Sequence, residues 1–254
     1  MNRIVTFASG KGGVGKTALA VATGQALVGA GHRVLLVDAD LGLANVDVQL
    51  GLNHPGHFGL ALAGRGTIAD ALLTEERTGL AILLGPSGWQ SMTRLEGPSL
   101  EQLGREIRAL AAGYDLTLLD CSSGIATSTL ELVRMAEEVL VVVTAEPTSL
   151  TDAYALIKVG LRSSSKVAVV VNMAIDQDDG LLTFAKLQRT AKRFLDLELA
   201  LAGIVRRDPR VPDAISCQQP LLTRSPNCPA ADDVRELARK IGARATEPKP
   251  SAAQ

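Results

Sequence analysis

The sequence predicts an α/β protein in which a mostly parallel, doubly wound sheet is flanked by helices. Short apolar segments rich in β-branched residues recur along the chain, each long enough for one buried strand. Most of them are separated by stretches of helical periodicity, an alternation that is typical of parallel sheets. The composition is 46% hydrophobic but only 3% aromatic, so the core must consist of Val, Leu, Ile and Ala, as in sheets covered on both faces.

Seven segments are predicted as strands. They lie at 4–8, 34–37, 80–84, 116–119, 139–143, 167–171 and 201–205. The ligands of such a sheet bind at the carboxyl ends of its strands, so the residues that follow each strand are the candidates for function.

Helix starts are marked in three places. Alanine and leucine at helical spacing predict a helix at 17–27. Ser99 with Gln102 and Ser149 with Asp152 form the capping-box pattern, which predicts helices at 100–111 and 151–161.

The length of the chain predicts one domain. A chain of 254 residues can bury a sizeable core, and α/β proteins of this length often form a single unit. We expect the domain to occupy residues 1–245. Residues 246–254, rich in Pro, Ala, Lys and Ser, are expected to form a disordered tail.

A glycine-rich loop directly follows the first predicted strand. Its sequence, GKGGVGKT, fits the pattern G-x-x-x-x-G-K-[ST], in which glycine backbone offers its N–H groups to phosphate oxygens. Because a strand precedes the loop and a helix follows it, the motif predicts a site for a nucleoside triphosphate. The candidate nucleotide-binding residues of this segment are Gly10, Lys11, Gly12, Gly13, Val14, Gly15, Lys16, Thr17 and Ala18.

The chemistry of the ligand explains these residue types. Glycine permits the unusual dihedrals and the close approach that adjacent phosphates require. Lys16 supplies a positive charge for the β and γ phosphates, and the hydroxyl of Thr17 is suited to ligating Mg²⁺. ATP or ADP with Mg²⁺ are therefore the expected cofactors. The second cation of the loop, Lys11, is by its spacing alone as compatible with a solvated surface residue as with a functional one.

Polar residues end three of the predicted strands. Asp38 and Asp40 are two residues apart, so in an extended segment they point to the same side, and Asp120 ends another strand as a magnesium-binding carboxylate would. Asn172 ends a third, with an amide that can donate to and accept from an adenine edge. Taken alone, an aspartate or asparagine in this position is also common as a turn residue.

The loop GKGGVGKT and the segment DADLGLANVDVQLGL (residues 38–52) resemble the deviant phosphate-loop ATPases of the MinD and ParA group. Residues 146–158 are most similar to its flagellar number regulators, FlhG and FleN. The resemblance, which covers residues 3–241, implies a MinD-like P-loop NTPase fold and an ATP-bound homodimer. It also implies slow hydrolysis of ATP in the control of flagellar number or placement.

The resemblance implies a role for each candidate residue. Lys11 would reach across the dimer interface to the phosphates held by the partner subunit, and Asp40 would position the attacking water. Asp38 would lie near the magnesium and the loop lysine, Asp120 would bind the magnesium directly or through water, and Asn172 would read the base. Asp208 and Pro209 would lie in the loop that closes over it.

The chain departs from the family at two points. Asp120-Cys121-Ser122-Ser123-Gly124 matches the second switch in its first and last residues but differs between them. Only Met1 and Asn2 precede the first strand, so we do not expect the extra N-terminal segment with which some flagellar regulators stimulate a partner GTPase. The partners implied are a GTPase like FlhF or a transcription activator like FleQ.

Charge and cysteine content narrow the function further. The net charge of −1 disfavours nucleic acid as a partner, although residues 186–244 carry 12 Lys and Arg against 7 Asp and Glu. Three cysteines without a C-x-x-C pair indicate a reducing, cytoplasmic location and disfavour an iron–sulfur carrier. The last helix has an apolar face without an aromatic anchor, so we expect it to pack on the body, with peripheral contact at the inner face of the membrane as the alternative.

Two other functions remain open. A ParA-like ATPase would position division machinery, DNA or another cargo, and in the DNA case it would bind with a steep dependence on salt. A non-catalytic protein would use ATP only as a conformational ligand to sequester a transcription activator. Phosphate release that depends on Asp40 would exclude the second.

Overall fold

The computed structural model describes residues 2–88, 97–161 and 166–245. Its strands form one sheet. Their bounds are β1 Arg3–Ser9, β2 Val34–Ala39, β3 Leu72–Thr74, β4 Ala81–Leu83, β5 Leu116–Ser123, β6 Glu138–Val143, β7 Lys166–Ala174 and β8 Ala200–Arg206. The order across the sheet is β3-β4-β2-β5-β1-β6-β7-β8. Every neighbouring pair is parallel except β3 with β4, which confirms the predicted fold class.

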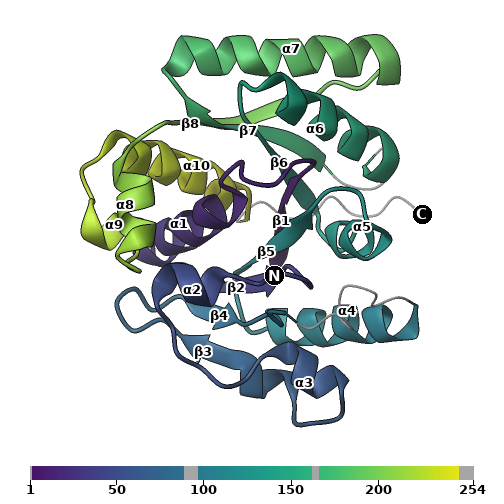
Figure 1. Ribbon diagram of the computed structural model, residues 1–254, viewed down its shortest axis with the longest axis vertical. Helices are drawn as coiled ribbons and strands as arrows, with labels where there is room; N and C mark the ends of the chain where they lie inside the picture. Colours follow the sequence, from purple (N-terminus) through teal and green to yellow (C-terminus); the bar gives the residue numbers. More distant parts are fainter. Residues whose placement is uncertain (1, 89–96, 162–165, 246–254) are drawn as a thin grey trace.

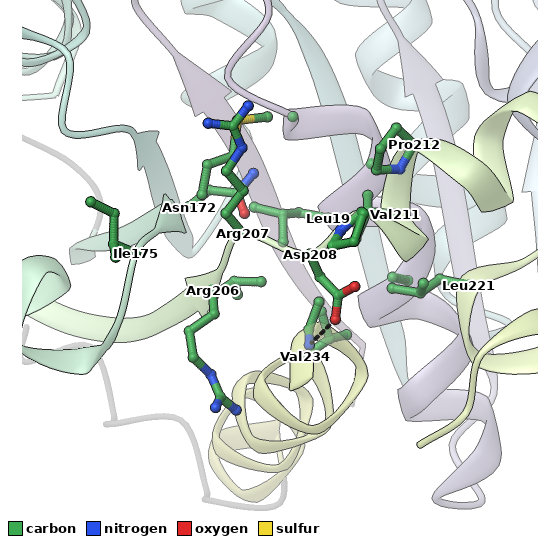
Figure 2. Close-up of a pocket in the computed structure, with 17 residues that line it drawn as sticks. Leu19, Asn172, Ile175, Arg206, Arg207, Asp208, Val211, Pro212, Leu221 and Val234 are labelled. Atoms are coloured by element: carbon green, nitrogen blue, oxygen red, sulfur yellow. Dashed lines mark hydrogen bonds between the residues drawn. The ribbon is translucent and has the colours of Figure 1, made fainter. Parts of the chain in front are cut away.

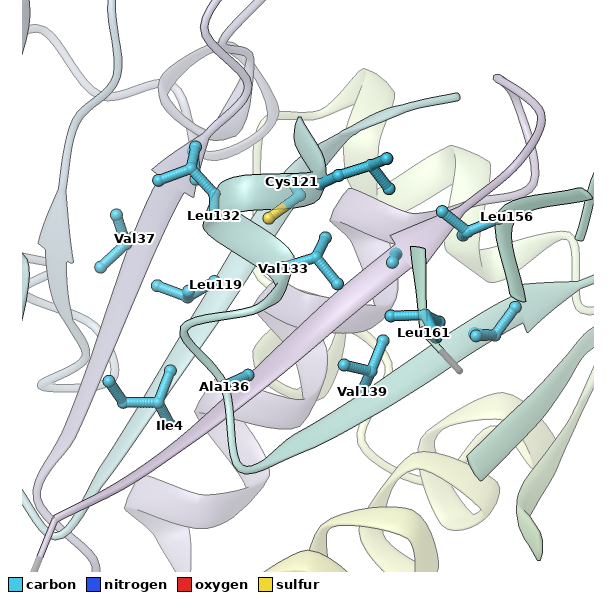
Figure 3. Packing of buried hydrophobic residues seen from close by; sticks show 14 of the residues in the cluster. Ile4, Val37, Leu119, Cys121, Leu132, Val133, Ala136, Val139, Leu156 and Leu161 are labelled. Carbon is cyan, nitrogen blue, oxygen red and sulfur yellow. The ribbon is translucent and has the colours of Figure 1, made fainter. Parts of the chain in front are cut away.

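Helices cover both faces of the sheet (Figure 1). The helices are α1 Lys16–Gly29, α2 Val46–Leu50, α3 Phe58–Leu62, the 3₁₀ helix η1 Ile68–Ala71, α4 Pro98–Ala111, α5 Thr127–Val133, α6 Pro147–Gly160, α7 Gln177–Leu195, α8 Arg210–Ser216, α9 Leu221–Arg224 and α10 Pro229–Ala245. One buried cluster joins the sheet to α4, α5, α6 and α7, and Figure 3 shows part of it. A second cluster joins the opposite face to α1 and α10.

All seven predicted strands are present, and one strand was missed. β3 has only three residues, lies at the edge of the sheet and pairs antiparallel with β4. A segment this short carries too few residues for a periodic signal, so its pairing with β4 had to come from the tertiary structure. The expected tail at 246–254 lies outside the described residues.

Both predicted capping boxes are wrong. α4 begins at Pro98 and α6 at Pro147, two and four residues before the predicted starts, because proline at the first helical position has the required φ and needs no partner for its missing N–H. The side chain of Ser149 caps no helix. Its hydroxyl oxygen accepts a hydrogen bond from the amide of Thr144, 3.0 Å away, just after β6.

The last helix packs on the body, as predicted. Val234, Leu237, Ala238 and Ile241 of α10 are each at most 3% exposed, and α10 lies against α1 and β8. Its apolar face is therefore covered by protein. Over the described ranges, no helix is both long enough and apolar enough to cross a bilayer.

A buried carboxylate fastens the end of α10 to the sheet. Glu138, at the start of β6, is 1% exposed, and its two oxygens contact the guanidinium groups of Arg3, at 2.8 Å, and Arg244. Because both cations are only partly exposed, they depend on Glu138 to neutralise their charge.

We expect Glu138→Gln to lower the free energy of unfolding by about 3 kcal/mol, since removing one partner of a buried ion pair leaves the other charge uncompensated. Urea denaturation followed by circular dichroism measures the loss. The matched control is Glu236→Gln, which removes a half-exposed carboxylate paired with Arg239 and should cost less than about 1 kcal/mol. Equal losses for the two variants would contradict the proposed role of Glu138.

Candidate nucleotide site

The glycine-rich loop joins β1 to α1 in a conformation that only glycine adopts readily. Gly13 and Gly15 have φ values of +78° and +82°, in the left-handed region that side chains disfavour. Gly10 allows a close approach instead, because a Cβ there would lie 2.2 Å from the backbone carbonyl of Asp152 in α6. The loop thereby presents its backbone at the N-terminus of α1, where amides attract anions.

Lys16 and Asp120 form an ion pair at the base of the loop. Lys16 Nζ lies 2.6 Å from Asp120 Oδ1, and both residues are buried. Burial favours the neutral lysine, but the adjacent Asp120 carboxylate outweighs this effect, and the pKa of Lys16 is raised. The other oxygen, Asp120 Oδ2, is buried and has no hydrogen-bond partner among the described residues. The site therefore has a carboxylate oxygen that can bind a cation.

Asp38 lies beside Asp120 because β2 and β5 pair in register. Burial, together with the nearby charge of Asp120, raises the pKa of Asp38 to about 7. Its Oδ2 accepts hydrogen bonds of 2.9 Å from the amides of Asn45 and Val46. Asp38 thus fixes the start of α2 and the loop before it, while standing next to the predicted magnesium carboxylate.

Asp40 lies in that loop and is held by three donors. Its Oδ1 accepts hydrogen bonds from the amides of Gly42, at 3.1 Å, and Leu43, at 3.0 Å, and from the hydroxyl of Ser122, at 2.8 Å. Across the described part of the chain, no donor reaches Oδ2. One carboxylate oxygen is therefore fixed and the other is available to a water molecule.

Thr17 is the second residue of α1 and is half-buried. Among the described residues, no three His, Cys, Asp or Glu side chains gather as a complete metal site. Magnesium, however, keeps several waters and is commonly held by one or two carboxylates together with substrate phosphates. The unpartnered oxygen of Asp120 beside the phosphate loop fits that type of binding.

Lys11 does not join Lys16 in this single chain. Its ammonium group contacts the carboxylate of Glu146 and the hydroxyl of Thr148, the latter at 2.9 Å, at the start of α6. The side chains of Lys11 and Glu146 are 36% and 64% exposed. The two lysines of the loop thus have different surroundings, one buried at its base and one on the surface.

A cavity of about 620 Å³ adjoins the phosphate loop at Gly15 and Ala18. Asn172 stands at its edge (Figure 2) and is 7% exposed. Its Nδ2 donates a hydrogen bond to the carbonyl oxygen of Val14, 2.8 Å away, which leaves its carbonyl oxygen as an acceptor. An acceptor suits the amino group of adenine.

Asp208 and Pro209 also line this cavity. The carboxylate of Asp208, however, accepts hydrogen bonds from the amides of Arg210, at 2.9 Å, and Ala230, at 3.4 Å. Burial favours the neutral acid, but these bonds keep its pKa below the usual value. Asp208 therefore shapes the loop by tying it to the start of α10, and Figure 2 shows its bond to that helix.

Sequence reasoning missed two parts of the site. The apolar wall of the cavity includes Leu19, Ala22 and Leu221, of which the first two could have been found from the helical spacing of α1. Ser122 was noted only as a departure from the family. Strand alternation could have placed it on the same face as Asp120, two residues earlier.

Comparison with known proteins agrees with this geometry. The family model for the CobQ/CobB/MinD/ParA nucleotide binding domain matches residues 5–221. The chain belongs to this family. It is accordingly a nucleotide-binding ATPase of the MinD/ParA group.

The relatives of this MinD/ParA ATPase include an antiactivator and a flagellum site-determining protein. It is 38% identical over 241 residues to the antiactivator FleN of Pseudomonas aeruginosa, covering 94% of this chain and 86% of FleN. It is 30% identical to the flagellum site-determining protein YlxH of Helicobacter pylori, over 80% of this chain and 69% of YlxH. Among solved structures, the MinD cell division ATPase of Pyrococcus furiosus superposes with a TM-score of 0.82 at 24% identity, covering 96% of this chain and 100% of that one.

Proposed function

We propose that this ATPase is a molecular switch that dimerises when it binds ATP and separates after slow, magnesium-dependent hydrolysis. The observation that carries the proposal is that the two lysines of the loop have different surroundings. Lys16 is buried against Asp120, whereas Lys11 lies on the surface with exposed partners. Lys16 serves the nucleotide of its own chain, and Lys11, once it leaves its exposed partner Glu146, reaches the nucleotide of a second copy.

The residues of the pocket divide the reaction between them. Backbone amides of the loop and the ammonium group of Lys16 hold the phosphates of ATP, and Asp40 orients a water molecule through its available oxygen. Magnesium, when bound at Asp120 and Thr17, would supply positive charge against the phosphate oxygens. Catalysis of this kind is mostly positioning and electrostatic stabilisation. A solved MinD of the same fold, from Pyrococcus horikoshii, is complexed with Mg-ADP, which supports this choice of cofactors.

The oligomeric state tests the switch. We expect a monomer in size-exclusion chromatography with light scattering when the protein carries ADP or no nucleotide, and a dimer with ATP and Mg²⁺. Dimer formation requires Lys11 to leave Glu146, and this exposed ion pair should cost only about 1 kcal/mol to break. A monomer under all conditions would contradict the proposal.

We expect Asn172→Ala to weaken ATP binding about tenfold, because the variant removes both the acceptor for adenine and the bond to Val14. Asn172→Asp is the informative companion, since it keeps the acceptor but loses the donor to the loop. Equilibrium titration with a fluorescent ATP analogue measures both affinities. Unchanged affinity in Asn172→Ala would remove Asn172 from the site.

The cellular role that we propose is control of flagellar number or placement. The relative YlxH supports it, because that protein is named a flagellum site-determining protein, and residues 146–158 resemble the flagellar number regulators. Because FleN is named an antiactivator, a transcription activator like FleQ is the partner we favour, ahead of a GTPase like FlhF. Capture of partners from the source cell with an ATP-trapped variant distinguishes the two.

A positioning role for division machinery, DNA or another cargo is the second candidate. It is favoured by a MinD relative from Bacillus subtilis that is 30% identical over 95% of this chain and 89% of its own length. Binding to DNA that depends on ATP and falls steeply with salt would support a partition function. We place the protein in the cytoplasm, and contact with the membrane through α10 would require that helix to leave the body.

A further inference from the structure

We propose that Ser122 is a positioning residue for ATP hydrolysis, whose hydroxyl holds the carboxylate of Asp40 and ties the loop after β2 to the end of β5. The hydrogen bond from Ser122 Oγ to Asp40 Oδ1 is 2.8 Å long and joins residues 82 positions apart. The inference rests on the proposed role of Asp40 in orienting water, which it deepens.

The pairing of two strands places Ser122 at this point. β2 and β5 are parallel and in register, with Asp38 opposite Asp120 and Ala39 opposite Cys121. Side chains alternate between the faces of a sheet, so Cys121 enters the buried cluster beneath (Figure 3). Ser122, the next residue, returns to the face that carries Asp120, and there its hydroxyl meets Asp40.

The three donors to Asp40 Oδ1 have different origins. The amides of Gly42 and Leu43 belong to the loop of Asp40 itself, so their hydrogen bonds move with the loop. Ser122 is the donor that comes from another strand, and that strand also carries Asp120. Its bond therefore fixes Asp40 relative to the Lys16–Asp120 pair, which the two amides cannot do.

This arrangement predicts an effect on hydrolysis but not on binding. The hydroxyl of Ser122 bonds Asp40, whereas Lys16 and Asn172 are held by Asp120 and Val14. Loss of the Ser122 hydroxyl therefore leaves the contacts of these ATP-binding residues unchanged. Without the hydroxyl, the Asp40 carboxylate would pivot with its loop and present its available oxygen to water less often. Such a loss of orientation slows the chemical step.

The test compares Ser122→Ala, Ser122→Thr, Asp40→Ala and the double variant of Ser122→Ala with Asp40→Ala. Single-turnover phosphate release measures hydrolysis, and titration with a fluorescent ATP analogue measures affinity. For Ser122→Ala we expect hydrolysis to fall about 3- to 10-fold, as for one lost hydrogen bond of typical net strength, because the two amide donors to Asp40 remain. The ATP Kd should stay within about twofold of the wild type. Ser122→Thr keeps the hydroxyl and suits a strand, so its rate should stay within about twofold of the wild-type rate.

The double variant separates positioning from general structure. If Ser122 acts through Asp40, its removal has no further effect on hydrolysis once Asp40 is alanine. The proposal would be overturned if Ser122→Ala released phosphate at the wild-type rate while Asp40→Ala was slower. An equal loss in the Asp40→Ala background would also overturn it, as would a Ser122→Ala defect that Ser122→Thr shares. Normal hydrolysis by Asp40→Ala would instead refute the proposed role of Asp40 itself.

Discussion

Lys16→Ala should lower the affinity for ATP about a thousandfold, the largest effect that we expect from any single substitution. The ammonium group of Lys16 is held 2.6 Å from Asp120 at the base of the loop, so the variant removes the buried cation that would face the phosphates. It also leaves Asp120, which is fully buried, as an uncompensated negative charge where a polyanion must bind. Isothermal titration with ATP and Mg²⁺ measures the loss.

Two controls make this result interpretable. Lys186→Ala removes an exposed lysine of α7 and should leave the affinity unchanged. A thermal unfolding curve of each variant without nucleotide shows whether the Lys16→Ala protein is folded, since the unpaired Asp120 should also lower its stability. A folded Lys16→Ala protein that binds ATP like the wild type would refute the site.

Asp40→Ala should leave ATP binding within about threefold of the wild type and slow hydrolysis about a hundredfold, the usual contribution of a residue that activates water. Lys16 and Asn172, the residues expected to bind ATP, are held by Asp120 and Val14 rather than by Asp40, so the substrate keeps its contacts. Because hydrolysis ends the dimeric state, the variant should accumulate as a dimer with ATP and Mg²⁺. Gel filtration and phosphate release are the two measurements.

Asp47→Ala is the matched control, because Asp47 lies in α2 of the same segment and its carboxylate accepts a hydrogen bond from a local amide, that of Val48. This variant should cycle between monomer and dimer as the wild type does. An Asp40→Ala protein that stays monomeric with ATP would count against the switch. Phosphate release at the wild-type rate would count against the role of Asp40 in hydrolysis.

Much of the site could be predicted because its signals are local. The loop carries its glycines, lysines and threonine in one stretch, and Gly13 and Gly15 adopt the conformation that their residue type permits. Asp38 and Asp120 follow or end buried strands, and the carboxyl ends of parallel strands meet at one edge of a sheet. Their proximity therefore followed from the fold class, and the register of β2 with β5 confirms it.

Contacts that depend on exact packing could not be predicted. The helix starts at Pro98 and Pro147 were placed wrongly because two short polar patterns imitate a capping box, while backbone geometry decides which residue begins the helix. The partners of Lys11, which are Glu146 and Thr148, lie more than a hundred residues away. Loop conformation, which the local sequence does not encode, brings them together.

The sequence by itself determined the fold class, the phosphate loop and the strands whose ends carry the carboxylates, because periodicity and motif spacing are properties of neighbouring residues. Only the tertiary structure decided that Ser122 holds Asp40 and that Glu138 pairs with both Arg3 and Arg244. The same is true of Asp208, whose carboxylate binds an amide of its own loop. The contacts of Ser122 and Glu138 depend on the register of paired strands. The hydrogen bond from Ala230 to Asp208 depends on how α10 packs against the sheet. A one-residue shift in register would turn each strand side chain to the opposite face.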